Sequence, residues 1–321
     1  MSGTLNRRAA TLALVSALAV TATACGSSDD DAKQASSGGG KHAVSTAMGK
    51  VEVPDHPKRV VVLDTDALDS AVTLGVKPVG AVTVVAGAPL STYLPEEKIK
   101  GIKEVGLIGE PNLEAINELK PDLILSSKVR DEKNYKELSQ IAPTVFSETT
   151  GPTWRENFQL HADALGRKAE AEKVVSAYET EVAGVTKALG GPEKAKRLKF
   201  GFVRFVEGAD TRLYFNDTFV GSIFKDLKVG RPANQDKTGF SLDVSPEKID
   251  EANADVIFYS TYGDPKKAKE TSITGSSLWK NLTAVRNKKA FKVDDNLWML
   301  GIGYTGAGRV LDEMEKNYAA E

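Results

Sequence analysis

The sequence is poor in the residues that form disulfides or bind metals. It has one cysteine, Cys25, so no disulfide can form within the chain. It has three histidines, His42, His56 and His161, and they are not clustered. Direct coordination of iron or zinc by the protein is therefore not expected, because such sites need several nitrogen, sulfur or carboxylate ligands together.

The sequence also lacks an excess of one charge. After residue 25 it has no apolar run that approaches the roughly 20 residues of a membrane span. The 42 Lys and Arg residues nearly balance the 44 Asp and Glu residues, for a net charge of −2. Nucleic acid and anionic membrane surfaces are therefore not expected as the main partner. Hydrophobic residues make up 41% of the 321 residues, which is typical of a globular protein with a sizeable core, and the length favours two domains.

Residues 1–24 predict an export signal. Arg7 and Arg8 precede the apolar run 9–20, and small residues lead to Cys25. This arrangement resembles a bacterial lipobox, in which the cysteine becomes the lipid-carrying amino terminus, although Ala22 stands where Leu, Val or Ile is usual. The alternative is an ordinary signal peptide with an incidental cysteine. The two arginines leave the Sec and twin-arginine export routes open.

A disordered tether is predicted to follow, so that residues 25–48 comprise the lipidated cysteine and the tether. Residues 26–41 are rich in Ser, Gly and Asp and have no apolar periodicity. The mature protein is therefore expected at the extracytoplasmic face of a bacterial membrane, where a lipid anchors it.

Strands and helices alternate after residue 57. R-V-V-V-L-D (59–64), V-G-A-V-T (79–83), P-D-L-I-L-S-S (121–127) and P-T-V-F (143–146) are short apolar runs that predict buried strands. Helical patterns separate them at 66–74, 112–120 and 134–142. This alternation predicts βαβ units and a mainly parallel sheet.

A long helical stretch interrupts the alternation. The pattern predicts helices over 154–165 and 168–189, and the second ends at Gly190, Gly191 and Pro192. Strand and helix patterns then resume and end with a helix near residues 307–316. We therefore predict an α/β fold with two Rossmann-like lobes, 49–165 and 191–321, joined by a backbone helix over 166–190.

The two predicted lobes share a local repeat. E-A-I-N-E-L-K-P-D-L-I-L-S begins at Glu114, and E-K-I-D-E-A-N-A-D-V-I-F-Y begins at Glu247. Both fit a helix that leads into a strand, which favours two related lobes over chance similarity. Ligands of parallel sheets bind at the carboxyl ends of the strands, so a ligand cleft is expected between the lobes.

Several segments together resemble a known family. They are the lipobox, the Ser/Gly tether, R-V-V-V-L-D, L-G-V-K-P-V-G, E-P-N-L-E-A-I-N-E-L-K-P-D-L-I-L, A-D-V-I-F and L-W-K-N-L-T-A-V-R-N-K-K-A-F-K-V-D with the Trp298 region. In this order they resemble the ferric-siderophore-binding lipoproteins, which belong to the helical-backbone class of solute-binding proteins. The resemblance implies capture of a ferric siderophore for an ABC importer, with little lobe movement. It also implies a monomer that is not an enzyme.

A ferric siderophore brings its own iron ligands, so no cofactor is expected and the cleft needs apolar walls with a few donors. Arginines and aromatic residues near predicted strand ends are the candidates, although aromatic side chains are more often core residues. The predicted ligand-binding residues are Tyr93, Arg130, Trp154, Arg204, Phe240, Tyr259, Tyr262 and Trp298.

The scarcity of cationic candidates bears on the ligand. Only Arg130 and Arg204 are basic, which favours a neutral or cationic hydroxamate such as a ferrioxamine over a polyanionic complex. In the periplasmic ferric-hydroxamate binders, however, an arginine precedes the E-P-N-L-E segment, where this chain has Ile108 and Gly109. A catecholate siderophore, haem or cobalamin remains the alternative ligand.

The resemblance also implies that Glu114 and Glu247 dock onto arginines of the permease. The alternative is that each only favours the start of a helix. A secreted enzyme is the remaining alternative. G-I-G-Y-T-G (301–306) matches a dinucleotide fingerprint, but only 15 residues follow it, too few for the strand and acidic residue of that site.

Overall fold

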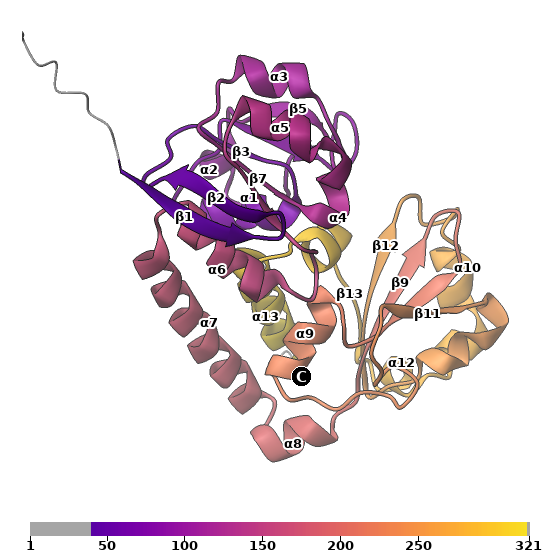
Figure 1. Ribbon diagram of the computed structural model, residues 1–321. Coiled ribbons are helices and arrows are strands. Elements are labelled where there is room, and N and C mark those ends of the chain that lie inside the picture. Colours follow the sequence, from indigo (N-terminus) through magenta and orange to yellow (C-terminus); the bar gives the residue numbers. More distant parts are fainter. Residues whose placement is uncertain (1–39, 320–321) are drawn as a thin grey trace, which may run out of the picture. The chain divides into compact units, whose positions relative to one another are not determined.

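The structure is a computed structural model that describes residues 40–319. The predicted export signal and Cys25 lie outside the described residues. The described residues all belong to one unit by their contacts, and within it two α/β lobes are visible (Figure 1). Of the helices in the described part of the chain, none has the length and apolar character needed to cross a membrane.

The first described element corrects the predicted extent of the tether. Strands β1 (Lys41–Thr46) and β2 (Gly49–Pro54) form an antiparallel hairpin. Val44 and Val53 are fully buried in it, and its turn rests on β8 through a hydrogen bond from the Ala47 amide to the Phe146 carbonyl. Residues 41–48 are therefore part of the fold, because alternate residues of the hairpin face the core.

The N-terminal lobe contains a six-stranded sheet in the order β6-β5-β4-β3-β7-β8. All neighbours are parallel except β5 and β6. Its strands are β3 (Val60–Val62), β4 (Gly80–Thr83), β5 (Lys103–Leu107), β6 (Glu110–Pro111), β7 (Leu123–Ser127) and β8 (Thr144–Ser147). Its helices are α1 (Thr65–Thr73), α2 (Glu96–Ile99), α3 (Leu113–Glu118), α4 (Lys128–Asp131), η1 (Glu132–Asn134), α5 (Tyr135–Ile141) and α6 (Trp154–Ala164).

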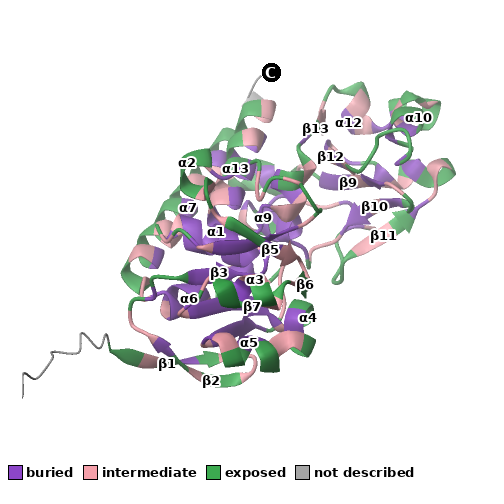
Figure 2. Cartoon of the chain, turned by 90° about the horizontal axis from the view of Figure 1, so that it is seen from above, coloured by how far each residue is buried: buried purple, intermediate pink, exposed green. Residues whose placement is uncertain are grey.

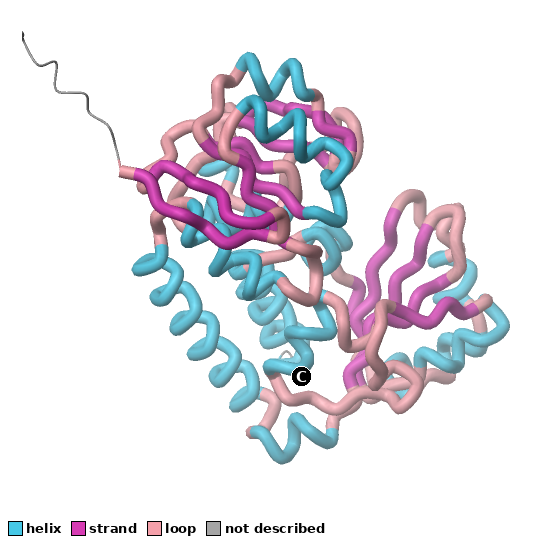
Figure 3. The backbone as a smooth tube through the Cα atoms, viewed as in Figure 1, coloured by secondary structure: helices cyan, strands magenta, loops and turns pink. Residues whose placement is uncertain are grey.

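The C-terminal lobe contains a five-stranded sheet in the order β11-β10-β9-β12-β13. Figure 3 shows the strands of both lobes in magenta. In this C-terminal sheet, β9, β12 and β13 are parallel, whereas β10 and β11 are antiparallel to their neighbours. Its strands are β9 (Phe200–Val206), β10 (Thr211–Tyr214), β11 (Ser241–Val244), β12 (Val256–Tyr262) and β13 (Ala290–Lys292). The sheet is thus mixed, because a short turn joins β9 to β10, and β11 returns antiparallel beside β10 after a longer connection that contains α9.

The helices of this half of the chain are α8 (Pro192–Arg197), α9 (Phe219–Asp226), α10 (Glu270–Gly275), α11 (Ser277–Lys280), α12 (Thr283–Arg286) and α13 (Tyr304–Ala319). Two further segments are η2 (Pro246–Ala252), a 3₁₀ helix, and η3 (Asn296–Leu300), a π-helical turn. The repeat beginning at Glu247 is therefore a 3₁₀ helix followed by β12, whereas its counterpart at Glu114 is an α-helix followed by β7.

The predicted backbone helix is confirmed as α7 (Lys168–Ala188), whose 21 residues span about 32 Å. Its buried residues are Ala171, Tyr178 and Val185, seven positions apart, so one narrow stripe packs on the protein. It contacts α6 and α13, and Figure 2 shows its other side exposed.

Buried contacts connect the two lobes. The indole Nε1 of Trp154 on α6 donates to Ser222 Oγ on α9 over 2.9 Å. The Asp69 carboxylate on α1 accepts from the amides of Thr305 (3.2 Å) and Gly306 (3.0 Å) at the start of α13. One hydrophobic cluster runs through both lobes, and each lobe has a smaller cluster of its own besides.

Asp69 makes stability depend on pH. Burial raises its pKa from 3.8 to about 7, although its hydrogen bonds lower it. The folded state therefore binds a proton that the unfolded state releases, and the stabilisation is lost as pH rises from about 4 to about 7. We expect the free energy of unfolding of the wild type, relative to that of Asp69→Asn, to fall by on the order of 2–4 kcal/mol over this range.

Urea unfolding of both proteins at the two pH values measures this difference. Asp250→Asn, at an exposed position, is the control and should follow the wild type at both values. An equal stability difference between wild type and Asp69→Asn at both values would show that Asp69 stays ionised throughout.

Candidate ligand-binding site

A pocket lies between the two lobes at the carboxyl ends of their strands. The N-terminal lobe contributes Thr65 and Leu68 after β3, and the loop 84–93 after β4. The C-terminal lobe contributes Tyr262, at the end of β12, with Asn296 and Leu300 of η3. Tyr93, which was predicted as a ligand contact, also lines this pocket, but it is buried and its hydroxyl bonds to Asp69.

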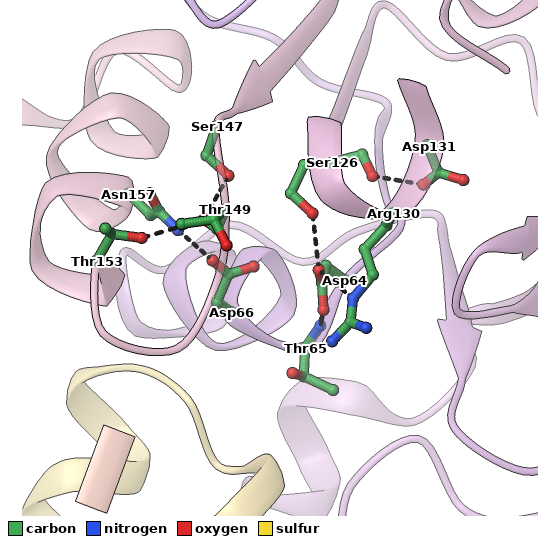
Figure 4. Close-up of polar contacts among 11 residues, drawn as sticks. Asp64, Thr65, Asp66, Ser126, Arg130, Asp131, Ser147, Thr149, Thr153 and Asn157 are labelled. Atoms are coloured by element: carbon green, nitrogen blue, oxygen red, sulfur yellow. Dashed lines mark hydrogen bonds and ion pairs between the residues drawn. The ribbon is translucent and has the colours of Figure 1, made fainter. Parts of the chain in front are cut away.

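Polar groups of the N-terminal lobe converge near the ends of β3 and β7 (Figure 4). Arg130 on α4 points toward Asp64, and its Nε lies 3.2 Å from Asp64 Oδ2. Ser127 donates to the same oxygen over 3.0 Å. Burial and the neighbouring Asp66 raise the pKa of Asp64 to about 6, although Arg130 lowers it. The side chain of Arg130 remains 39% exposed, so it can also reach a ligand.

Arg204 is the main donor of the C-terminal lobe. Its Nε lies 2.7 Å from Asp295 Oδ1 and its Nη2 lies 2.5 Å from Asp295 Oδ2. The guanidinium carbon lies 5.0 Å from the ring centre of Tyr262, and Nη1 lies 3.4 Å from the Tyr214 hydroxyl. Burial lowers the pKa of Arg204, but Asp295 more than offsets this effect. The arginine is thus held in one orientation beside the pocket.

Exposed apolar side chains lie in the pocket and beside these donors. Large hydrophobic residues are exposed at only five of the described positions. Val85 and Tyr262 line the pocket, Val129 precedes Arg130 in the chain, and Phe240 packs on Tyr214. Val85 follows β4, Val129 follows β7, and Tyr262 ends β12. Phe240 is 54% exposed and lies 5.0 Å from the Tyr214 ring. Water-exposed aromatic and aliphatic groups at a concave site are typical of ligand contacts.

Two predicted contacts lie in the core instead. Trp298 is fully buried, stacked between Phe202 and Phe258 at 5.7 and 4.6 Å, and its Nε1 donates to Glu313. Trp154 is 1% exposed at the junction of α6, α7 and α9. Neither indole has surface left for a ligand in this structure, because large aromatic rings fill cores as readily as they line pockets.

Tyr259 faces away from the pocket. It packs on Trp279 and Phe205 at 5.3 and 6.1 Å, on the other side of the sheet from Phe258. Side chains three positions apart on a strand point to opposite faces. Tyr259 and Tyr262 therefore cannot both face the ligand, and the structure brings only Tyr262 to the pocket.

The sequence prediction missed three groups of site residues. Asp295, the partner of Arg204, follows the last strand in K-V-D-D-N. Arg212 lies directly opposite Arg204 in the sheet. Arg212 and Tyr214 are two positions apart on β10, and this spacing could have indicated that both side chains face the same side of the sheet. The loop 84–93 has no charged residue and one aromatic residue, Tyr93, so its composition gives little indication of a ligand contact.

Glu114 and Glu247 lie outside the pocket. Both are exposed in the first turn of α3 and η2. A hydrogen bond to its own amide and one from Ser245 lower the pKa of Glu247, so it is ionised at neutral pH. Within residues 40–319, no three His, Cys, Asp or Glu side chains are arranged to hold a metal ion.

Comparison with known families identifies the fold. The family model described as periplasmic binding protein matches residues 60–297, which is most of the chain. The chain belongs to the periplasmic binding protein family. Members of this family bind ligands, and the prediction that the chain is not an enzyme is thereby confirmed.

Individual members of the periplasmic binding protein family are similar over most of their length. The probable siderophore-binding lipoprotein YfiY of Bacillus subtilis is 40% identical, over 91% of this chain and 92% of YfiY. The Dickeya dadantii achromobactin-binding periplasmic protein is 30% identical, over 81% and 86%. The Staphylococcus aureus SirA structure, a complex with staphyloferrin B, is 36% identical, with a TM-score of 0.77, over 86% of this chain and 98% of SirA.

Proposed function

We propose that the protein captures a ferric siderophore outside the cytoplasm and delivers it to an ABC importer for iron uptake. The observation that carries the proposal is the mainly apolar interlobe pocket with an arginine beside it in each lobe, since Arg204 contacts the pocket residue Tyr262 and Arg130 pairs with Asp64, next to the pocket residue Thr65. Such a surface suits a ligand with an apolar exterior and oxygen acceptors around its own metal. The relatives named for siderophores support the same ligand class.

Within this class, a ferric complex of low charge, such as a ferric hydroxamate, fits the pocket best. Each arginine near the pocket already has a carboxylate partner, so the site offers hydrogen-bond donors without much net positive charge.

A carboxylate siderophore is the second candidate. It is favoured by the similarity to SirA, which was crystallised with staphyloferrin B. A pocket for such a ligand must offset several negative charges, which requires the arginines to exchange their carboxylate partners for the ligand. The two candidates therefore differ in the charge that the pocket tolerates.

Titration calorimetry with a panel of ferric complexes tests the function. We expect a ferric hydroxamate to bind with a dissociation constant below about 1 µM, and more tightly than ferric citrate, a ferric tricatecholate, haem or cobalamin. Tyr262→Ala should weaken binding by about 1–2 kcal/mol, because the ring is exposed in the pocket and covers Arg204.

Leu278→Ala is the matched control. Leu278 is 40% exposed, like Tyr262, but lies on α11 and does not line the pocket. Its replacement should leave binding unchanged. Failure of every ferric siderophore to bind would reject the proposed function, whereas preference for ferric citrate would favour the second candidate.

Delivery requires the protein to remain near the importer. We propose that Cys25, which lies outside the described residues, carries the lipid anchor and becomes the amino terminus. We further propose that Glu114 and Glu247 contact the permease. They are exposed, they lie at corresponding positions of the two lobes, and they do not line the pocket.

A further inference from the structure

We propose that Asp295 determines which ferric complexes the pocket accepts, by cancelling the charge of Arg204. This inference rests on the proposed function and concerns the same site. Both carboxylate oxygens of Asp295 are used, since Oδ1 accepts from Arg204 Nε and Ser260 Oγ (2.6 Å), and Oδ2 accepts from Arg204 Nη2. The side chains of both residues are 11% exposed, so little solvent screens the pair.

The geometry leaves Arg204 one free edge. Its Nε–Nη2 side is occupied by Asp295, and the ring of Tyr262 lies near its carbon. Only the edge formed by Nη1 and Nη2 has donors to spare, because the contact of Nη1 with the Tyr214 hydroxyl is long at 3.4 Å. A ligand oxygen that approaches this edge meets a donor whose positive charge is already neutralised.

This arrangement favours the iron-bound oxygens of an uncharged or cationic complex over free carboxylates. A hydroxamate oxygen bound to iron gains most of its energy from the hydrogen bond itself, whereas a free carboxylate needs a net positive charge to offset its loss of water. The neighbouring Arg212 does not supply that charge. It faces Asp243 at 3.6 Å, and the two arginines lie opposite each other in the sheet, where like charges repel unless each has a counterion.

Asp295→Asn tests the inference, because it removes the charge and keeps an oxygen that can accept from Arg204. The probes are ferrioxamine B, a cationic ferric hydroxamate, and ferric citrate, an anionic complex. We expect the ratio of their dissociation constants, ferric citrate over ferrioxamine B, to fall by about tenfold or more in the variant. Tighter binding of ferric citrate and weaker binding of ferrioxamine B should both contribute.

Two variants serve as controls. Ser260→Ala removes a hydrogen bond to Asp295 without changing charge, and Asp250→Asn removes an exposed charge from η2 in the same lobe. Both should keep the wild-type ratio within about threefold. A ratio that is unchanged in Asp295→Asn, or that falls equally in either control, would overturn the inference while leaving ferrioxamine binding, and hence the proposed function, intact.

A measurement on the wild type applies if Asp295→Asn does not fold. Lowering the salt concentration from about 1 M to about 0.01 M lengthens the screening distance from about 3 Å to about 30 Å. The affinity for ferric citrate should change little, because the pocket presents no net positive charge. A rise of about tenfold or more would reveal an uncompensated cation and would overturn the role given to Asp295.

Discussion

Reversing the charge of Glu114 and Glu247 together is expected to abolish cellular uptake of the ferric siderophore and to leave its binding unchanged. Binding should persist because neither residue lines the pocket. Uptake should be lost because two new lysines would face the arginines proposed on the permease, and like charges across an interface cost several kcal/mol. The measurement is uptake of radiolabelled iron by complemented cells, beside calorimetric titration of the purified double variant.

The same two elements provide a matched control. Glu118 on α3 and Asp250 on η2 are also exposed, so the double variant Glu118→Lys/Asp250→Lys makes the same change of charge on the same segments. It should support uptake close to that of the wild type. Equal loss in both double variants would point to a general charge effect, and normal uptake in the first would make the glutamates simple helix-terminal charges, worth about 0.3–1 kcal/mol each.

Trp298→Ala is expected to lower the free energy of unfolding by about 3–5 kcal/mol. The indole is fully buried, its ring stacks on Phe202 and Phe258, and its Nε1 hydrogen bond to Glu313 joins η3 to α13. Removing it leaves a cavity between the sheet of the C-terminal lobe and η3. Urea unfolding measures the loss, and titration with ferrioxamine B below the transition measures binding.

Trp298→Phe separates packing from direct contact with the ligand. It keeps an aromatic ring against Phe202 and Phe258 but loses the hydrogen bond and part of the buried indole, so stability should fall less, by about 1–2 kcal/mol. Both variants should bind the ligand with nearly wild-type affinity while folded. A loss of affinity of about tenfold or more in Trp298→Ala under those conditions would mean that the ligand reaches the indole after all.

The order of elements could be predicted from local patterns. The apolar run 59–64 contains β3, and the helical pattern 168–189 contains α7. These features depend on residues within one or two turns of each other. The hairpin β1–β2 was missed because the Ser/Gly-rich segment before it concealed the alternation that begins at Lys41.

The site was predicted less completely, because a residue type does not reveal its neighbours. Arg204 was correctly placed near the end of β9, but its pairing with Asp295 joins residues 91 positions apart. Tyr259 and Trp298 are aromatic residues of the type that often contacts ligands. Tyr259 nevertheless lies on the far face of the sheet, and Trp298 lies inside the core.

The sequence alone therefore determined the α/β class, the long connecting helix and the family resemblance, since each depends on local periodicity or on motifs in order along the chain. Only the tertiary structure decided which aromatic rings stay exposed and which carboxylates accompany Arg130 and Arg204. Burial and ion pairing depend on which segments, far apart in the sequence, the fold brings together, and a local pattern does not specify which segments meet in space.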